Sequence, residues 1–374
     1  MTVGPARIVV VDDSTVIRGL LSRFIDADPA LTVVTTAANG QIGVDKVRAH
    51  DPDLVVLDVE MPVMDGLRAL REIRRTHPAL PVIMFSTLTG RGAATTIEAL
   101  AAGASDYAAK PTATGTTVDA MGQVRDELLS KIHAILGSGT PPRAVRPGTA
   151  PVAAPTPAPA RAVRRSPAGG VIEAIVIGSS TGGPVALEQL LTSVAVPFPI
   201  PVFVVQHMPP NFTKALADRL DRKTPHRVIE ASDGIIATAG TVHIAPGGRH
   251  LRLERRPAGV TLTVDDGPAR NSCRPSVDPL FDSAAEVYGS HVVAVMLTGM
   301  GADGTAGTRC LADRGCDVIA QDERSSTVWG MPRSVVEAGL ATEVLPLDRI
   351  GERLAQLVRS RSSRVPVAPG GAST

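Results

Sequence analysis

The sequence predicts two α/β domains, each built on a doubly wound parallel sheet, because short apolar runs alternate with amphipathic helical stretches on both sides of a proline-rich segment. With 374 residues the chain is long for one domain, and its length favours two domains of about 150 residues each. We expect domains over residues 1–136 and 171–360, joined by a linker over 137–170 and followed by a flexible tail over 361–374.

The first half contains five apolar runs that we expect to form parallel strands. They cover residues 8–11, 32–36, 54–57, 82–85 and, more weakly, 106–109. After the first run, apolar residues recur every four positions from Val16 to Phe24, with a second such series beginning at Ile17. This spacing predicts a helix whose wide apolar face covers the sheet.

The segment over residues 137–170 is rich in proline and arginine, contains no acidic residue and has hardly any periodic apolar residue. Such a composition cannot offset the entropy lost on ordering, and proline favours an extended backbone. We therefore expect a semi-stiff tether that keeps the two domains at a high mutual concentration.

The second half repeats the alternation of strands and helices. Apolar runs over residues 172–177, 201–205, 292–297 and 318–320 are expected to be buried parallel strands, and a helix is expected over 185–191. One stretch differs, because polar and apolar residues alternate over 250–256 and 260–266 around Pro257-Ala258-Gly259. This pattern predicts a hairpin that adds an antiparallel edge to the sheet.

Composition excludes several classes of protein. Lysine and arginine total 38 against 37 acidic residues, and the chain has one Trp, two Tyr and six Phe, which argues against a nucleic-acid partner. No apolar run approaches the roughly 20 residues of a membrane span, and Asp12 and Asp13 follow the first run where a signal peptide would stay apolar. Three cysteines are too few for a disulfide scaffold. We expect a cytoplasmic protein without membrane insertion.

Polar residues gather where the strands of the first domain end. Asp12 and Asp13 follow the first strand and Asp58 follows the third, so three carboxylates meet at the carboxyl edge of the sheet. Mg²⁺ is the natural ion for such a cluster. Ser86 and Lys110, at the ends of the fourth and fifth strands, add a hydroxyl and an ammonium that can hold phosphoryl oxygens.

These residues closely resemble the receiver domain of two-component response regulators over residues 6–130. The matching motifs are Val11-Asp12-Asp13-Ser14, Leu57 to Gly66, and Lys110-Pro111. The resemblance implies a flavodoxin-like fold that binds Mg²⁺. It also implies a role for each matching residue: Asp58 is the phosphoacceptor, Asp12 and Asp13 hold the metal with it, Ser86 or the adjacent Thr87 is the switch hydroxyl, Lys110 contacts the phosphoryl group, and Tyr107 is the switch aromatic.

The second domain carries the parts of a serine hydrolase. Gly178 to Gly183 fits the pattern G-x-S-x-G and places Ser180 on a turn between a strand and a helix, although such a turn also suits a nucleotide phosphate. His207 follows the next predicted strand, and Asp303 lies in a glycine-rich loop after a third one. If all three strands are parallel, an alcohol, a base and an acid meet at one edge.

This half resembles the catalytic domain of the CheB chemotaxis methylesterases. The matching motifs are Gly178 to Gly183, Gln206 to Pro210, Ile244 to Gly247, Arg274 to Asp278, and Leu297 to Gly304. The resemblance implies that Ser180, His207 and Asp303 are catalytic. It further implies that the enzyme demethylates glutamate methyl esters and deamidates glutamines on chemoreceptor helices, without a cofactor in the esterase, for sensory adaptation. Thr181 and Met300 are our candidates for oxyanion contacts.

The order of the two domains adds a hypothesis about regulation. A histidine kinase of the CheA type is the phosphodonor that the resemblance implies, and we hypothesise that the unphosphorylated receiver blocks the mouth of the esterase. The residues favour three alternatives less. A transcriptional regulator would need a helix-turn-helix or a basic stripe, and the second half shows neither pattern. A nucleotide-binding output domain would use Gly178 to Gly183 as a phosphate loop, but this loop lacks the Lys-Ser/Thr ending of a P-loop. A cysteine hydrolase centred on Cys273 lacks an evident histidine or acid partner in the sequence.

Overall fold

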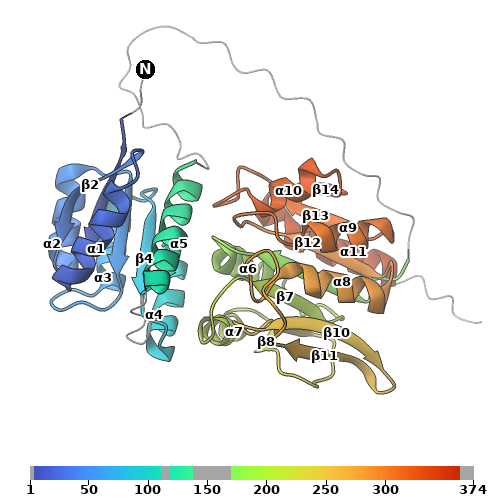
Figure 1. The fold of residues 1–374 in the computed structure, drawn as a ribbon. Helices are drawn as coiled ribbons and strands as arrows, with labels where there is room; N and C mark the ends of the chain where they lie inside the picture. The colour runs from blue at the N-terminus through green and yellow to red at the C-terminus, as the bar shows by residue number, and fades with distance from the viewer. Residues whose placement is uncertain (1–3, 111–117, 138–169, 363–374) are drawn as a thin grey trace, which may run out of the picture.

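The computed structural model describes residues 4–110, 118–137 and 170–362, and it contains two α/β domains side by side (Figure 1). The expected linker lies outside the described residues except at its two ends, Gly137 and Gly170. The expected tail also lies outside them except at its start, where the last helix continues to Ser362. Arg361 in that helix forms an ion pair with the buried Asp317 at 2.7 Å, which explains why the helix extends past the expected end of the domain.

The first domain has a five-stranded parallel sheet in the order β2-β1-β3-β4-β5. Its strands are β1 (Ala6–Val11), β2 (Leu31–Ala37), β3 (Leu54–Asp58), β4 (Val82–Ser86) and β5 (Asp106–Ala109). Its helices are α1 (Thr15–Asp26), α2 (Gly40–His50), α3 (Gly66–Thr76), α4 (Gly90–Ala101) and α5 (Val118–Gly137). Helices α1 and α5 bury one face of the sheet, and α2, α3 and α4 bury the other. All five expected strands are present.

The second domain has a seven-stranded parallel sheet in the order β14-β13-β12-β6-β7-β9-β8. Its strands are β6 (Ala174–Ser179), β7 (Val202–Gln206), β8 (Arg227–Glu230), β9 (Thr241–Ile244), β12 (Val292–Met296), β13 (Asp317–Gln321) and β14 (Glu343–Leu345). One face is covered by α6 (Gly183–Thr192), α7 (Phe212–Lys223) and α11 (Leu347–Ser362). The other is covered by α8 (Val277–Tyr288), α9 (Thr305–Asp313) and α10 (Met331–Glu337).

The hairpin is present, but it does not form an edge of this sheet as expected. Strands β10 (His250–Arg256) and β11 (Gly259–Asp265) form a separate two-stranded antiparallel sheet. Leu251 and Leu262 are fully buried and belong to the core beside α8, so the apolar side of the hairpin is covered by packing and not by pairing with the main sheet. Strands β8, β9 and β14 were not expected, since each has only three or four residues.

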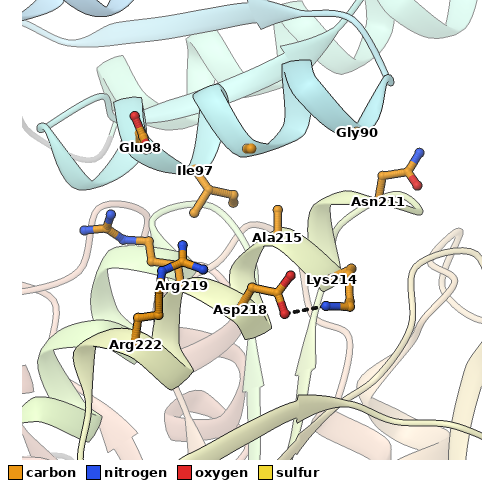
Figure 2. A pocket seen from close by; sticks show the side chains of 10 residues that line it. Gly90, Ile97, Glu98, Asn211, Lys214, Ala215, Asp218, Arg219 and Arg222 are labelled. Carbon is orange, nitrogen blue, oxygen red and sulfur yellow. Dashed lines mark hydrogen bonds and ion pairs between the residues drawn. The ribbon is translucent and has the colours of Figure 1, made fainter.

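The two domains contact each other through α4 of the first and α6 and α7 of the second, and their cores merge there. The rings of Tyr107 in β5 and Phe212 in α7 stack with centroids 4.8 Å apart. Figure 2 shows α4 above α7, with Ile97 and Ala215 facing each other across a pocket of about 250 Å³. This contact brings β5 close to residues 180–182, which connect β6 to α6 and are called the serine loop below.

Candidate active site and phosphorylation site

The serine loop lies at the carboxyl edge of the second sheet, between two neighbouring strands. β6 pairs with β7 on one side and β12 on the other, so Ser180 follows β6 between the loops that follow those strands. The Ser180 amide donates to Thr298 O at 3.0 Å, and Gly183 N donates to Ser180 O at 2.7 Å. Gly182, at φ +77°, allows the chain to turn sharply into α6.

His207 and Asp303 form a direct hydrogen bond at this edge. His207 follows β7, whose last residue is opposite Ser179 in the register of the sheet, so His207 and Ser180 are neighbours across the strand ends. The Nε2 atom of His207 lies 2.8 Å from Oδ2 of Asp303. Parallel strands therefore bring the three predicted catalytic residues to one rim.

Several donors hold the carboxylate of Asp303, which is 3% exposed. Its oxygens accept hydrogen bonds from Ser276 Oγ at 2.6 Å, Val277 N at 2.6 Å and Asn271 Nδ2 at 2.7 Å, in addition to His207. Burial by itself would raise the pKa of Asp303, but the hydrogen bond from His207 and the other donors outweigh it and lower this pKa to about 2. The carboxylate is therefore charged.

The pKa of the His207 imidazole is raised, in the opposite direction to that of Asp303. Burial would lower the pKa of His207, whereas its hydrogen bonds with Asp303 and Cys273 outweigh burial and raise the pKa to about 9. The imidazolium therefore predominates near neutral pH, and the neutral imidazole, the form that can act as a general base, is the minor form until the pH approaches 9.

The hydroxyl of Ser180 has no hydrogen-bond partner within the described residues, so no bond joins it to His207. Catalytic hydrogen bonds commonly tighten only when substrate binds. Since Nε2 of His207 bonds to Asp303, Nδ1 is the ring nitrogen that is left for proton transfer.

Both oxyanion candidates lie beside the serine. Within the described part of the chain, the backbone amides of Thr181 and Met300 have no acceptor, so each can donate to a ligand. At Gly299, a Cβ atom would lie 2.8 Å from Cβ of Ser180 and 2.5 Å from Sδ of Met331, so only glycine fits there. The Thr181 side chain is already engaged, because its Oγ1 donates to Oδ2 of Asp106 in the receiver at 2.8 Å.

Two further residues lie at this site: Gln206, to which the sequence interpretation gave no role, and Cys273, which it considered only as the centre of a cysteine hydrolase. The buried Gln206 donates from Nε2 to Ser180 O at 2.9 Å and accepts from Ser179 Oγ at 2.7 Å, so it links β6 and β7 below the serine. Cys273 lies with its Sγ 3.7 Å from His207 Nδ1, although the sequence offered it no evident histidine partner. The position of Gln206 at a strand end next to His207 was the signal that could have identified it.

The acidic residues of the first domain converge as expected. One oxygen from each of Asp12, Asp13 and Asp58 lies within 4.8 Å of the others. Lys110 Nζ lies 2.8 Å from Asp12 Oδ2 and 2.8 Å from Asp58 Oδ1. The other oxygen of Asp58 is buried and has no hydrogen-bond partner among the described residues, so this donor set fits a hard divalent cation.

Electrostatics distinguishes Asp58 from an ordinary surface carboxylate. Burial raises its pKa to about 6, and the hydrogen bond and charge of Lys110 only partly oppose this effect. The Ser86 hydroxyl is buried and donates to Thr87 O and Gly92 O, each at 3.3 Å, and Thr87 Oγ1 contacts Thr89 Oγ1 at 3.2 Å. Neither hydroxyl bonds to Asp58 in this state, so the choice between them remains a prediction.

Comparisons with known proteins agree with both halves of the chain. The response regulator receiver domain model matches residues 8–121, and the CheB methylesterase model matches residues 175–354. A protein-glutamate methylesterase/protein-glutamine glutaminase of Nocardioides sp. is 48% identical over 96% of this chain and 98% of its own length. One of Nitrobacter hamburgensis is 43% identical over 94% of each chain.

A solved structure is also similar to the second half. The crystal structure of the CheB methylesterase catalytic domain of Thermotoga maritima is 47% identical and covers 50% of this chain and 99% of that chain, with a TM-score of 0.49. In the described ranges, no helix is both long and apolar enough to cross a membrane. By its sequence relatives, this chain belongs to the CheB family of protein-glutamate methylesterase/protein-glutamine glutaminase enzymes, with a receiver domain ahead of its methylesterase domain.

Proposed function

We propose that this protein hydrolyses glutamate methyl esters to glutamate and methanol, and deamidates glutamines, on the cytoplasmic helices of chemoreceptors. The observation that carries this proposal is the meeting of Ser180, His207 and Asp303 at one sheet edge, with the His207–Asp303 bond at 2.8 Å. Family membership favours this function over a transcriptional regulator or a nucleotide-binding output domain. Residues 1–136 would form the receiver and 171–360 the esterase.

The reaction follows from the roles of the three side chains. Ser180 Oγ attacks the side-chain carbonyl carbon while His207 Nδ1 accepts the hydroxyl proton, and the amides of Thr181 and Met300 stabilise the oxyanion. The C–O bond to the methoxy group then breaks, and the imidazolium returns its proton so that methanol leaves; from glutamine, ammonia leaves. Water attacks the acyl-enzyme with His207 as base, which frees glutamate and restores Ser180.

The receiver is the proposed switch for this activity. Asp12, Asp13 and Asp58 would hold Mg²⁺, whose charge would offset that of an incoming phosphoryl group. Asp58 would accept that group from a histidine kinase of the CheA type, and Lys110 would hold it. Ser86 and Tyr107 are the expected switch residues.

Contacts between the domains support control by occlusion. Strand β5 carries Asp106 and Tyr107, which contact the esterase, and it ends just before Lys110, which contacts the phosphoacceptor. Asp106 binds Thr181, the residue next to the proposed nucleophile. A linker over residues 137–170 would make this docking intramolecular, so a weak interface would suffice to keep activity low until Asp58 is phosphorylated.

The first test is methanol release from a methylated receptor by purified Ser180→Ala protein. Loss of the nucleophile is expected to remove most of the rate, leaving about 10³ to 10⁴ over the reaction in water from the other groups. Ser193→Ala is the matched control, because Ser193 lies at the far end of α6 and its hydroxyl bonds to Leu190 O at 2.7 Å. A wild-type rate from Ser180→Ala would contradict the proposed mechanism.

A further inference from the structure

A half-buried cysteine lies beside the proposed catalytic base, and the esterase mechanism does not use it. Cys273 Sγ is 3.7 Å from His207 Nδ1, and the ligand atoms of His207, Cys273 and Asp303 all lie within 4.8 Å of one another. We propose that Cys273 Sγ and His207 Nδ1 bind a Zn²⁺ ion, with Asp303 as the outer carboxylate, and that this ion reversibly inhibits the esterase.

The distance between the two ligand atoms suits zinc. Zn–S bonds of about 2.3 Å and Zn–N bonds of about 2.0 Å at a tetrahedral angle place sulfur and nitrogen roughly 3.5 Å apart. The observed separation of 3.7 Å needs only a small side-chain adjustment. Thiolate and imidazole are also the ligand types that select zinc over Mg²⁺, so the receiver cluster and this site would prefer different metals.

The histidine is oriented as metal-binding histidines usually are. Its other nitrogen, Nε2, bonds to Asp303, which gives the carboxylate–histidine arrangement that fixes the ring and strengthens it as a ligand. Asp303 is itself held by Ser276, Val277 N and Asn271. With two protein ligands, the remaining positions on the ion would be filled by water.

The backbone around the cysteine is firmly held as well. Arg270 and Cys273 exchange two backbone hydrogen bonds of 3.1 and 2.9 Å, which close a tight turn. The two residues inside that turn, Asn271 and Ser272, have left-handed φ angles of +52° and +61°. Asn271 Nδ2 joins the turn to Asp303 and Asp278. The thiol is therefore presented toward His207 by a strained but well-supported turn.

Inhibition follows from which ring nitrogen the metal occupies, and this step rests on the proposed function. Nδ1 is the nitrogen that would take the proton of Ser180, because Nε2 bonds to Asp303. An ion on Nδ1 blocks that transfer. Binding involves no redox step: the Cys273 thiol and the His207 imidazolium each release one proton to solvent, and Sγ and Nδ1 each donate an electron pair to the metal.

The test uses Co²⁺ as a probe for Zn²⁺ on the full-length protein, with saturating Mg²⁺ to occupy the receiver cluster. A thiolate-to-cobalt absorption band is expected for wild type and should disappear when Zn²⁺ or a chelator is added. Cys273→Ser should lack the band, whereas Cys310→Ser, the matched control at the other half-buried cysteine, should keep it. In Asp303→Asn, the affinity of the site for Zn²⁺, measured by its competition with Co²⁺, should fall by about 10- to 100-fold.

Methanol release provides the second readout. Zn²⁺ should inhibit wild type and Cys310→Ser. For Cys273→Ser, whose rates are expressed relative to its own metal-free rate, the same degree of inhibition should require at least about tenfold more Zn²⁺. No thiolate band in wild type, or an equal band in Cys273→Ser, would overturn the proposal. If Cys273→Ser fails to fold, loss of the band in His207→Gln serves the same purpose. Because the spectrum needs no turnover, failure of the esterase assignment alone would leave the band in place.

Discussion

At the level of single residues, Asp303 accepts hydrogen bonds from four donors, which is more than orientation of one imidazole requires. Ser276, Asn271 and the amide of Val277 all belong to the segment that leads into α8, while Asp303 comes from the loop after β12. They keep the carboxylate charged and fix its direction. We interpret Ser276 and Asn271 as positioning residues that act on the reaction through Asp303.

This interpretation predicts that Ser276→Ala lowers kcat for methanol release and leaves KM unchanged. A hydrogen bond to a charged group contributes about 1.5–3 kcal/mol, so the expected loss is about 10- to 100-fold. Ser283→Ala is the matched control, because Ser283 is a buried serine of α8 whose hydroxyl bonds only to backbone atoms of that helix and of the hairpin. A purely structural role of Ser276 would give equal kcat in both variants.

At the level of elements, β9 carries a histidine into the core of the esterase. His243 is 1% exposed, neither of its ring nitrogens has a hydrogen-bond partner among the described residues, and its ring stacks on Phe203 at 5.5 Å. Burial, with a smaller contribution from the charge of Arg227, lowers its pKa from 6.5 to about 4. The folded protein therefore holds this imidazole neutral.

The consequence is a defined pH dependence of stability. Between pH 6.5 and about 4 the unfolded chain binds a proton at His243 and the folded chain does not, so the free energy of unfolding should fall as pH drops, by up to about 3 kcal/mol. His243→Phe should remove this contribution. Urea unfolding followed by Trp329, the single tryptophan of the chain, reports on the esterase domain.

The comparison at pH 8 provides the control for this prediction. There the imidazole is neutral in both states, so any difference between wild type and His243→Phe measures packing alone. If the two proteins lost stability in parallel from pH 6.5 to 4, His243 would not be the group responsible.

At the level of the whole molecule, strand β5 extends from the contact with the esterase to Lys110, which binds the proposed phosphoacceptor Asp58. Residues of β5 contact Phe212 and Thr181, and α4 packs against α7. A displacement of β5 would therefore change the contact with Thr181, the residue next to Ser180. Coupling energies between such sites are commonly 1–3 kcal/mol.

Deleting residues 1–170 should consequently raise methanol release by the unphosphorylated protein, by about 5- to 150-fold. Tyr107→Ala in the full chain should raise it less, because it removes the stacking on Phe212 and leaves the contacts of α4. Asp58→Ala should keep its basal rate when Mg²⁺ and a small phosphodonor are added. An unchanged or lower rate after the deletion would contradict inhibition by occlusion.

Much of the fold could be predicted because its signals are local. Buried parallel strands appear as short apolar runs, and the expected helix from Val16 to Phe24 lies within α1. The sequence did not predict β8, β9 and β14, because each of these strands is short. In β9, His243 also interrupts the apolar run. The hairpin strands were expected within one residue of their observed bounds, but their separation from the main sheet was not.

The linear chain by itself determined that Ser180, His207 and Asp303 follow parallel strands, which places them at one edge whatever the details of packing. Only the tertiary structure decided which side chains surround them, since Cys273 reaches His207 and Asp106 reaches Thr181 from segments far apart in sequence. Periodicity encodes which face of an element is buried, whereas contacts between distant loops depend on how complete domains pack. That packing leaves no pattern in any local stretch of residues.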